Sequence, residues 1–273
     1  MGVCVRRLAL YSDIHGNVPA LAAVLDDIGA SGIEERYCLG DLVGYGPDPV
    51  GAIEMVRDTC DPVIRGNYDQ GVGDRSGACG CYYATDQAKS DGAASYEFTE
   101  RMVGDRDAEW LLGLEDGIRH DDGGVRILLT HGSPRRINEY LMPDRGEAQL
   151  ARLARDAGAD VVCCGHVHIP YHRSFYAEAD GTAASPVIHY VNSGSVGKPK
   201  DGDPRAGWIE LVIGGSAQVR AAVPDDAFAA SAGLSDTWVG VAFHRVEYDV
   251  DAVVEAMCSA GLPSTLAEAL RTG

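Results

Sequence analysis

The first part of the chain alternates short apolar segments with longer amphipathic ones, which is the pattern of βαβ units. Residues 5–13 predict a strand that ends in polar residues, and apolar side chains then recur at helical spacing over 17–31. Residues 35–41 predict a second strand, 48–58 a second helix, and 61–69 a third strand that runs into a Gly-Asn turn. This alternation predicts an α/β protein.

The middle of the chain is interrupted by a segment without periodicity. Residues 70–91 are rich in Gly, Asp, Ser and Cys, and we expect a loop there that is functional or mobile; whether it gates the site is left open. Helical patterning resumes over 93–114, followed by a hairpin formed by 117–121 and 125–134 and by a helix over 145–157.

The last part of the chain predicts mainly strands. We expect them over 160–166, 168–180, 186–197, 206–215 and 217–224. A strand near 241–248 and helices over 250–259 and 264–270 then predict a small C-terminal strand-helix unit, from about 236 to 273. Because no repeat or linker interrupts the pattern, we expect one domain over 1–273.

The net charge of the chain disfavours some classes of binding partner. The chain has 23 basic and 41 acidic residues, a net charge of −18, and an acidic surface repels nucleic acid and anionic lipid. A nucleic-acid duplex is therefore disfavoured as a partner. Only three of the basic residues are lysines, which favours adaptation to high salt, although an ordinary acidic cytosolic protein remains the alternative.

Other features indicate the compartment. No apolar run is long enough to span a bilayer, and the first residues predict a strand, not a signal peptide, so we expect a cytoplasmic protein without a membrane partner. Cys4, Cys38, Cys163 and Cys164 lie in apolar segments typical of reduced, buried thiols. Cys79 and Cys81 form a close pair that chelates a metal, responds to oxidants or, as we favour, constrains a loop.

Five short polar motifs follow apolar segments, each at a Gly-rich turn. In an open α/β sheet, ligands bind at the carboxyl ends of the strands, where such residues converge. Each motif alone has an ordinary reading as a turn or a core histidine. Two histidines separated by one residue point to opposite faces of a strand unless the chain turns between them. The motifs contain Asp13 and His15, Asp41, Asn67 to Asp69, His131, and His166 with His168.

The order D-x-H, G-D, G-N, H and G-H-x-H resembles the calcineurin-like metallophosphoesterase superfamily, from Tyr11 to about Arg205. The stretches GDLVGYGPDP, THGSP and NSGSVGKPKDGDPRA resemble its small prokaryotic phosphodiesterases more than its protein phosphatases. The resemblance implies a four-layer αββα sandwich, in which two mixed β-sheets are flanked by helices.

The resemblance also implies two divalent transition-metal ions. The first ion would be held by Asp13, His15, Asp41 and His168, and the second by Asp41, Asn67, His131 and His166, with Asp41 shared. Mixed imidazole and carboxylate ligation suits Mn²⁺, which we favour, or Fe, Zn²⁺ or Ni²⁺. A hydroxide bridging the ions would attack phosphorus. The catalytic residues would be Asp41, Asn67, Tyr68 and His131.

Tyr68 departs from the family, many of whose members have histidine there. A phenol donates a proton but supplies no imidazolium charge, so Tyr68 favours activated leaving groups if it faces the site; packing alone is the alternative. Asp69 orients that position or merely caps a turn. Ser193 replaces the usual proline of a turn. The expected phosphate contacts are Asn67, Ser195 and Arg205, with Lys198 a further candidate.

The sequence therefore predicts a metal-dependent phosphodiesterase for a small phosphate ester. A fold-retaining scaffold protein without catalysis is the alternative from another class, and a phosphomonoesterase or protein phosphatase is a third. A homo-oligomer is left open.

Overall fold

Two mixed β-sheets form the centre of the molecule. The structure is a computed structural model that describes residues 5–59, 61–177, 185–224, 229–233 and 236–273. Within these residues, each sheet has five strands. The first sheet has the order β2 (Glu35–Cys38), β1 (Arg6–Tyr11), β8 (Ala206–Gly215), β10 (Thr237–Val246), β9 (Ala229–Ser231). The second has the order β3 (Gly117–Asp122), β4 (Val125–Thr130), β5 (Val161–Cys164), β7 (Val187–Asn192), β6 (Tyr171–Tyr176).

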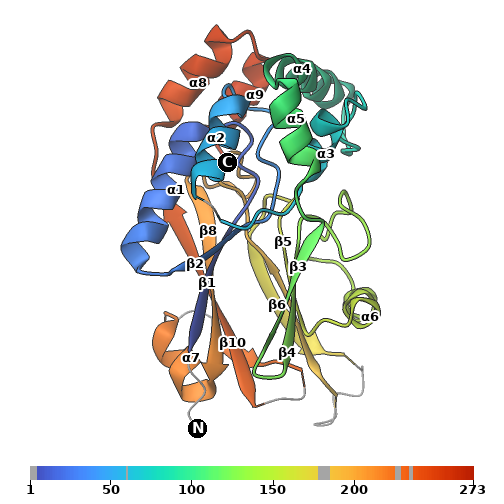
Figure 1. The fold of residues 1–273 in the computed structure, drawn as a ribbon, viewed down its shortest axis with the longest axis vertical. Helices are drawn as coiled ribbons and strands as arrows, with labels where there is room; N and C mark the ends of the chain where they lie inside the picture. Colours follow the sequence, from blue (N-terminus) through green and yellow to red (C-terminus); the bar gives the residue numbers. More distant parts are fainter. Residues whose placement is uncertain (1–4, 60, 178–184, 225–228, 234–235) are drawn as a thin grey trace.

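Helices cover the outer faces of the sheets and one end of the sandwich (Figure 1). They are α1 (Val18–Ser31), α2 (Pro49–Thr59), α3 (Asn67–Gly73), α4 (Asp86–Met102), α5 (Asp105–Leu112), α6 (Glu147–Ala157), α7 (Ser216–Ala222), α8 (Val250–Ser259) and α9 (Ser264–Ala269). Figure 1 shows α2 to α5, α8 and α9 gathered at the top, beyond the ends of the strands. This arrangement confirms the predicted four-layer sandwich.

The alternation of side chains along the strands divides the core into layers. Leu8 and Leu10 of β1 point to a cluster between the sheets, while Ala9 and Tyr11 point to the layer under α1 and α2. In the second sheet, Leu129 faces the space between the sheets and its neighbour Leu128 faces α6. The sheets thus share one apolar layer, and each packs a second layer against helices.

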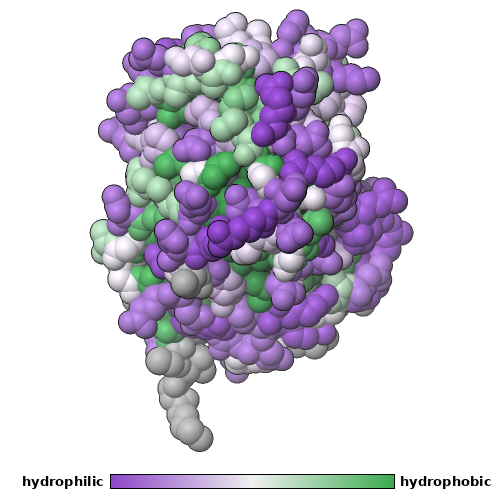
Figure 2. All heavy atoms as spheres, turned by 45° about the horizontal axis from the view of Figure 1, so that its top comes forward, coloured by the Kyte–Doolittle hydropathy of each residue, from purple (hydrophilic) through white to green (hydrophobic). Residues whose placement is uncertain are grey.

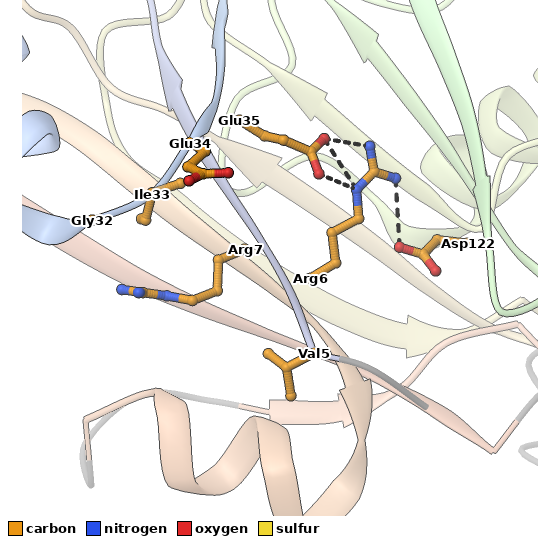
Figure 3. Close-up of a pocket in the computed structure, with 8 residues that line it drawn as sticks. All are labelled: Val5, Arg6, Arg7, Gly32, Ile33, Glu34, Glu35 and Asp122. Atoms are coloured by element: carbon orange, nitrogen blue, oxygen red, sulfur yellow. Dashed lines mark hydrogen bonds and ion pairs between the residues drawn. The ribbon is translucent and has the colours of Figure 1, made fainter. Parts of the chain in front are cut away.

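Arg6 joins the sheets at the end where β1 begins. Its guanidinium donates to Glu35 of β2 at 2.6 Å and approaches Asp122 of β3, in the other sheet, at 3.4 Å. Figure 3 shows Arg6 between these carboxylates, with Arg7 turned away. These four side chains line a pocket of about 480 Å³ at the start of β1. Asp13 follows the opposite end of that strand.

The surface agrees with the acidic composition. Hydrophilic residues cover much of the face in Figure 2, with hydrophobic residues in patches between them. In the part of the chain that the structure describes, no helix is both long and apolar enough to cross a bilayer.

Several local predictions are wrong. The segment expected as a strand over 217–224 is mostly α7, because it contains the helix formers Ala, Gln and Arg, and within α7 only Val219 is buried. The segment expected as a loop over 70–91 is helical at both ends, since α3 continues to Gly73 and α4 starts at Asp86, where Thr85 caps it, and the loop is confined to the residues between these helices. Residues 61–69 contain isolated bridge pairs at Val63 and Ile64 and the start of α3, not a full strand.

The remaining local predictions concern helix ends and cysteines. The helical stretch over 93–114 is two helices, α4 and α5, separated at Val103 and Gly104. Cys38, Cys163 and Cys164 are free and buried, as predicted. Cys4 and Cys60 lie outside the described residues.

We expect Leu211→Ala to lower the free energy of unfolding by about 2–5 kcal/mol, because it opens a cavity between the sheets. Leu211 is fully buried there, whereas Leu112 on α5 is 38% exposed. The matched variant Leu112→Ala should change stability by less than about 1 kcal/mol. Urea denaturation followed by circular dichroism measures both, and equal losses would contradict the assigned core.

Candidate metal centre

The predicted ligands come together where parallel strands end. Asp13 follows β1, Asp41 follows β2, and His131 and His166 follow β4 and β5. β1 is parallel to β2, and β4 is parallel to β5, so these residues leave the sheets at the same end. The seven predicted ligands are between 0% and 3% exposed: Asp13, His15, Asp41, Asn67, His131, His166 and His168.

The side chains form two adjacent groups. The ligand atoms of Asp13, His15 and His168 lie within 4.8 Å of one another, as do those of Asp41, His131 and His166. Asp41 Oδ2 lies between the groups, 3.8 Å from His15 Nε2 and 3.4 Å from His131 Nε2. Asn67 Oδ1 lies 3.0 Å from His131 Nε2, and so joins the second group.

Left-handed backbone conformations make this convergence possible. Asp13, His15, Asp41, His166 and His168 all have positive φ, from 49° to 69°. Such values are uncommon outside glycine and concentrate at functional sites. They turn the chain sharply after each strand, which explains how His166 and His168, separated by one residue, both face the site.

The chain segments of these turns lie so close together that two positions require glycine. A Cβ on Gly165 would lie 2.5 Å from Asp13 Oδ2, and one on Gly40 would lie 2.5 Å from the amide nitrogen of Gly66. A larger residue at either position would push the motifs apart.

The histidines are oriented by backbone carbonyls. Nδ1 of His15 donates to Val43 O at 2.9 Å, that of His131 to Leu39 O at 2.8 Å, and that of His168 to Lys198 O at 2.5 Å. Because a carbonyl only accepts, Nδ1 carries the proton and Nε2 presents a lone pair in the neutral ring. Metal-binding histidines are usually held in this way.

Several lone pairs therefore face one another without a proton between them. Nε2 of His15 and His168 lie 3.1 Å apart, and Asp13 Oδ1 lies 3.2 Å from the latter. Asp13 Oδ1 and His166 Nε2 are buried without a hydrogen-bond partner. Buried polar atoms are rarely left unpaired, so this donor set fits metal cations.

The electrostatics agree with neutral imidazoles in part of the site. Burial lowers the pKa of His166 and of His168 to about 3. Burial also opposes charge on His131, but the neighbouring Asp41 carboxylate outweighs it and raises the pKa of His131 to about 9. Burial opposes ionisation of Asp13, yet the surrounding histidines hold its pKa well below the usual value.

Asp41 is fixed by backbone hydrogen bonds that the motif did not reveal. Asp69 accepts from the amides of Asp41 at 2.8 Å, Leu42 at 2.9 Å and Gly66 at 2.9 Å. The amide of Tyr68 donates to Asp41 Oδ1 at 2.8 Å. Asp69 thus caps the start of α3, one of the roles expected from the sequence, and also joins that helix to the turn after β2.

The ring of Tyr68 is buried beside the first group. It packs edge-on against His15 with 5.4 Å between ring centroids and also contacts Tyr45. Its hydroxyl lies 3.4 Å from that of Tyr83, and burial raises its pKa well above the usual value. The side chain is therefore a neutral wall of the site.

The predicted phosphate contacts differ in position. The Ser195 hydroxyl donates to Asp13 O at 2.7 Å and accepts from the amide of Lys198 at 2.8 Å, so it joins two loops of the site. Arg205 is exposed and binds Asp203 through its guanidinium, at distances down to 2.7 Å.

A network of hydroxyls supports Asp13. Ser12 donates to Asp13 Oδ2 at 2.5 Å, and Ser193, where proline is usual, lies 2.7 Å from the Ser12 hydroxyl. The Ser12–Ser193 contact joins residues 181 positions apart, and the local sequence around either residue does not predict it.

A small cavity adjoins His15. Its walls include Tyr45 and Lys198, whose ammonium lies 4.8 Å from the Tyr45 ring centroid. The remaining walls come largely from the C-terminal helices and the residue after them: Val253, Met257, Leu266 and Leu270.

Comparisons with known proteins identify the family of the chain. The sequence matches the calcineurin-like phosphoesterase superfamily domain over residues 7–212. An uncharacterized protein of Methanocaldococcus jannaschii is 29% identical and aligns over 97% of this chain and 98% of its own length. Phosphodiesterase YfcE of Escherichia coli K12 is 28% identical over 72% of this chain and 83% of its own.

Solved structures show the same fold. A metallophosphoesterase from Sphaerobacter thermophilus is 26% identical, with a TM-score of 0.66 over 99% of this chain and 100% of that one. A hypothetical protein from Pyrococcus horikoshii is 21% identical, with a TM-score of 0.70 over 97% of both chains. The chain therefore belongs to the calcineurin-like phosphoesterase superfamily and is a metal-dependent phosphoric ester hydrolase.

Proposed function

We propose that this protein is a dinuclear phosphodiesterase that hydrolyses a small phosphate ester. The observation that carries the proposal is the pair of adjacent acceptor groups, in which His15 Nε2 and His168 Nε2 lie 3.1 Å apart with no donor between them. The likeness to phosphodiesterase YfcE supports the choice of a diester as substrate.

The proposed ligands of the first ion are Asp13, His15, Asp41 and His168, and those of the second are Asp41, Asn67, His131 and His166. We favour Mn²⁺, because imidazole with carboxylate suits such ions better than Mg²⁺ or Ca²⁺; Fe, Zn²⁺ and Ni²⁺ share that preference. When bound, the ions supply Lewis-acid polarisation of the phosphoryl group and lower the pKa of a water molecule.

The protein's own contribution is to hold the donor atoms in place. Asp69 and the Tyr68 amide fix both the backbone and the carboxylate of Asp41, and backbone carbonyls fix the tautomers of three histidines. Asn67 presents Oδ1 toward His131, and it is our proposed contact for the substrate phosphate as well as a ligand. For Ser195 we propose a supporting role through its hydrogen bonds to both loops.

Tyr68 sets the expected range of leaving groups. Because its phenol is neutral and lies beside Tyr83, it offers the departing oxygen no imidazolium charge. We propose that diesters with activated leaving groups react fastest. The burial of the seven ligands favours a small ester over a phosphoprotein, and the retention of every ligand argues against a scaffold protein that has lost catalysis.

We expect the protein loaded with Mn²⁺ to hydrolyse an aryl phosphodiester, and Asp41→Ala to reduce kcat/KM at least about a hundredfold, because both ions lose a shared ligand. Asp105→Ala, at a 99% exposed carboxylate, is the matched control and should retain activity. The assay compares release of the aryl alcohol with Mn²⁺, Ni²⁺, Zn²⁺ and Fe²⁺. Lack of activity with all four ions would favour the scaffold reading.

Asp69→Asn should lower metal affinity by about 10- to 100-fold, because an amide nitrogen would face backbone donors that Asp41 and Gly66 now direct at a carboxylate. Asp74→Asn, at the exposed end of the same helix, serves as the control. Isothermal titration with Mn²⁺ measures both. Unchanged affinity in Asp69→Asn would show that these hydrogen bonds do not position Asp41.

Metal binding should also raise the thermal midpoint of unfolding. A ligand at about 100 times its dissociation constant stabilises the folded state by about 2.7 kcal/mol, and here it would also relieve the repulsion between the facing lone pairs. Differential scanning calorimetry with Mn²⁺ and with a chelator tests this. The same midpoint in both conditions would argue against metal binding at this site.

A further inference from the structure

Two cysteine thiols lie unusually close together in the segment between α3 and α4. Cys79 Sγ and Cys81 Sγ are 2.7 Å apart, closer than the roughly 3.5–4.0 Å of ordinary contact between nonbonded carbon atoms. Gly80 has φ +69°, which allows the tight turn that brings them together. Asn138 Nδ2 donates to Gly80 O at 3.2 Å and holds the turn from the other side.

The same turn contacts a proposed metal ligand. Asn67 Nδ2 donates to Cys79 O at 2.9 Å and to Cys81 Sγ at 3.2 Å. These two hydrogen bonds set the orientation of the amide, so that Asn67 Oδ1 faces His131 and the metal centre. The position of the Cys81 sulfur is therefore connected to the second metal site through a single side chain.

Small reagents have access to the thiols. The pair lines a pocket of about 280 Å³, together with Tyr83, Lys89 and Tyr96. Cys79 is 8% exposed, and Cys81 is half-buried, so Cys81 is the more accessible of the two. Among the other described cysteines, Cys38, Cys163 and Cys164 are buried, and Cys258 is exposed on α8.

We propose that Cys79 and Cys81 are a redox-active pair that closes reversibly to a disulfide and thereby weakens the second metal site. The effect on the metal rests on the proposed function, whereas closure of the disulfide does not. The oxidant is a small-molecule disulfide such as oxidised glutathione.

The exchange balances in two steps. The thiolate of one cysteine of the pair attacks one sulfur of the small disulfide, whose S–S bond breaks and releases one small thiol. The thiolate of the other cysteine then attacks the protein sulfur of this mixed disulfide, forms the Cys79–Cys81 bond and releases the second small thiol. Two electrons pass from the protein to the small disulfide, and the two protons of the protein thiols end on the released thiols.

Closure brings the sulfurs to about 2.05 Å and replaces the thiol that Asn67 contacts by a disulfide sulfur. Asn67 Nδ2 then keeps Cys79 O as a partner but loses the present contact with Cys81, so Oδ1 is held less firmly toward His131. Loss of such a supporting contact lowers metal affinity by about tenfold or more.

The test uses the full chain in glutathione redox buffers, with free thiols alkylated and mapped by peptide mass spectrometry, and with Mn²⁺ affinity measured in parallel. We expect Cys79 and Cys81 to be protected together under oxidising conditions and released by dithiothreitol, with the affinity of the weaker Mn²⁺ site falling about tenfold. Cys81→Ser retains a hydroxyl acceptor for Asn67 and should make that affinity insensitive to the oxidant. Cys258→Ser is the control and should stay sensitive.

Three other results would each contradict a different part of the proposal: the disulfide, its connection to the metal site, or the metal site itself. Failure of Cys79 and Cys81 to pair, with glutathione found on Cys258 alone, would overturn the proposal. Pairing without a change in Mn²⁺ affinity would overturn the connection through Asn67. If neither form binds Mn²⁺, the proposed metal site fails, and the thiol mapping still decides whether the redox pair exists.

Discussion

The site depends on the repulsion between acceptor atoms that the fold forces together. Nε2 of His15 and His168 and Oδ1 of Asp13 are buried with lone pairs that face one another, and His166 Nε2 is buried without a hydrogen-bond partner. In a low-dielectric interior such an arrangement is unfavourable unless cations occupy it. Backbone carbonyl groups accept from Nδ1 of His15 and His168 and keep the proton on that nitrogen. A change of tautomer therefore does not relieve the repulsion. The fold thus keeps the site in a form that a metal ion completes.

The surrounding structure supplies the stability that this arrangement lacks. Left-handed conformations at five of the ligands are individually unfavourable, by about 1–3 kcal/mol each in typical cases. They persist because the loops are joined to one another by buried hydrogen bonds, such as those of Asp69 with Asp41 and of Ser195 with Asp13. The apolar layer between the sheets then holds the strands from which these loops emerge.

The sequence predicted more of the chemistry than of the local structure. Strand ends, Gly-rich turns and the order of the motifs identified residues such as Asp13 and His131 as neighbours, because the carboxyl ends of parallel strands meet at one edge. It could not predict that Lys198 O orients His168, or that Ser193 reaches Ser12, since these contacts join segments far apart in the chain. Nor did it find α7, whose helix-forming residues occur within an alternating pattern.

The cavity beside His15 draws its far wall from outside the family domain. That domain ends at residue 212, whereas Val253, Met257, Leu266 and Leu270 belong to the C-terminal segment. Thr265 of α9 also donates to Asp91 of α4 at 2.6 Å, which ties this segment to the rest of the upper layer. Side chains outside the metal motifs therefore pack directly beside His15, so a substitution in this C-terminal segment changes the surroundings of that histidine while every motif residue stays the same.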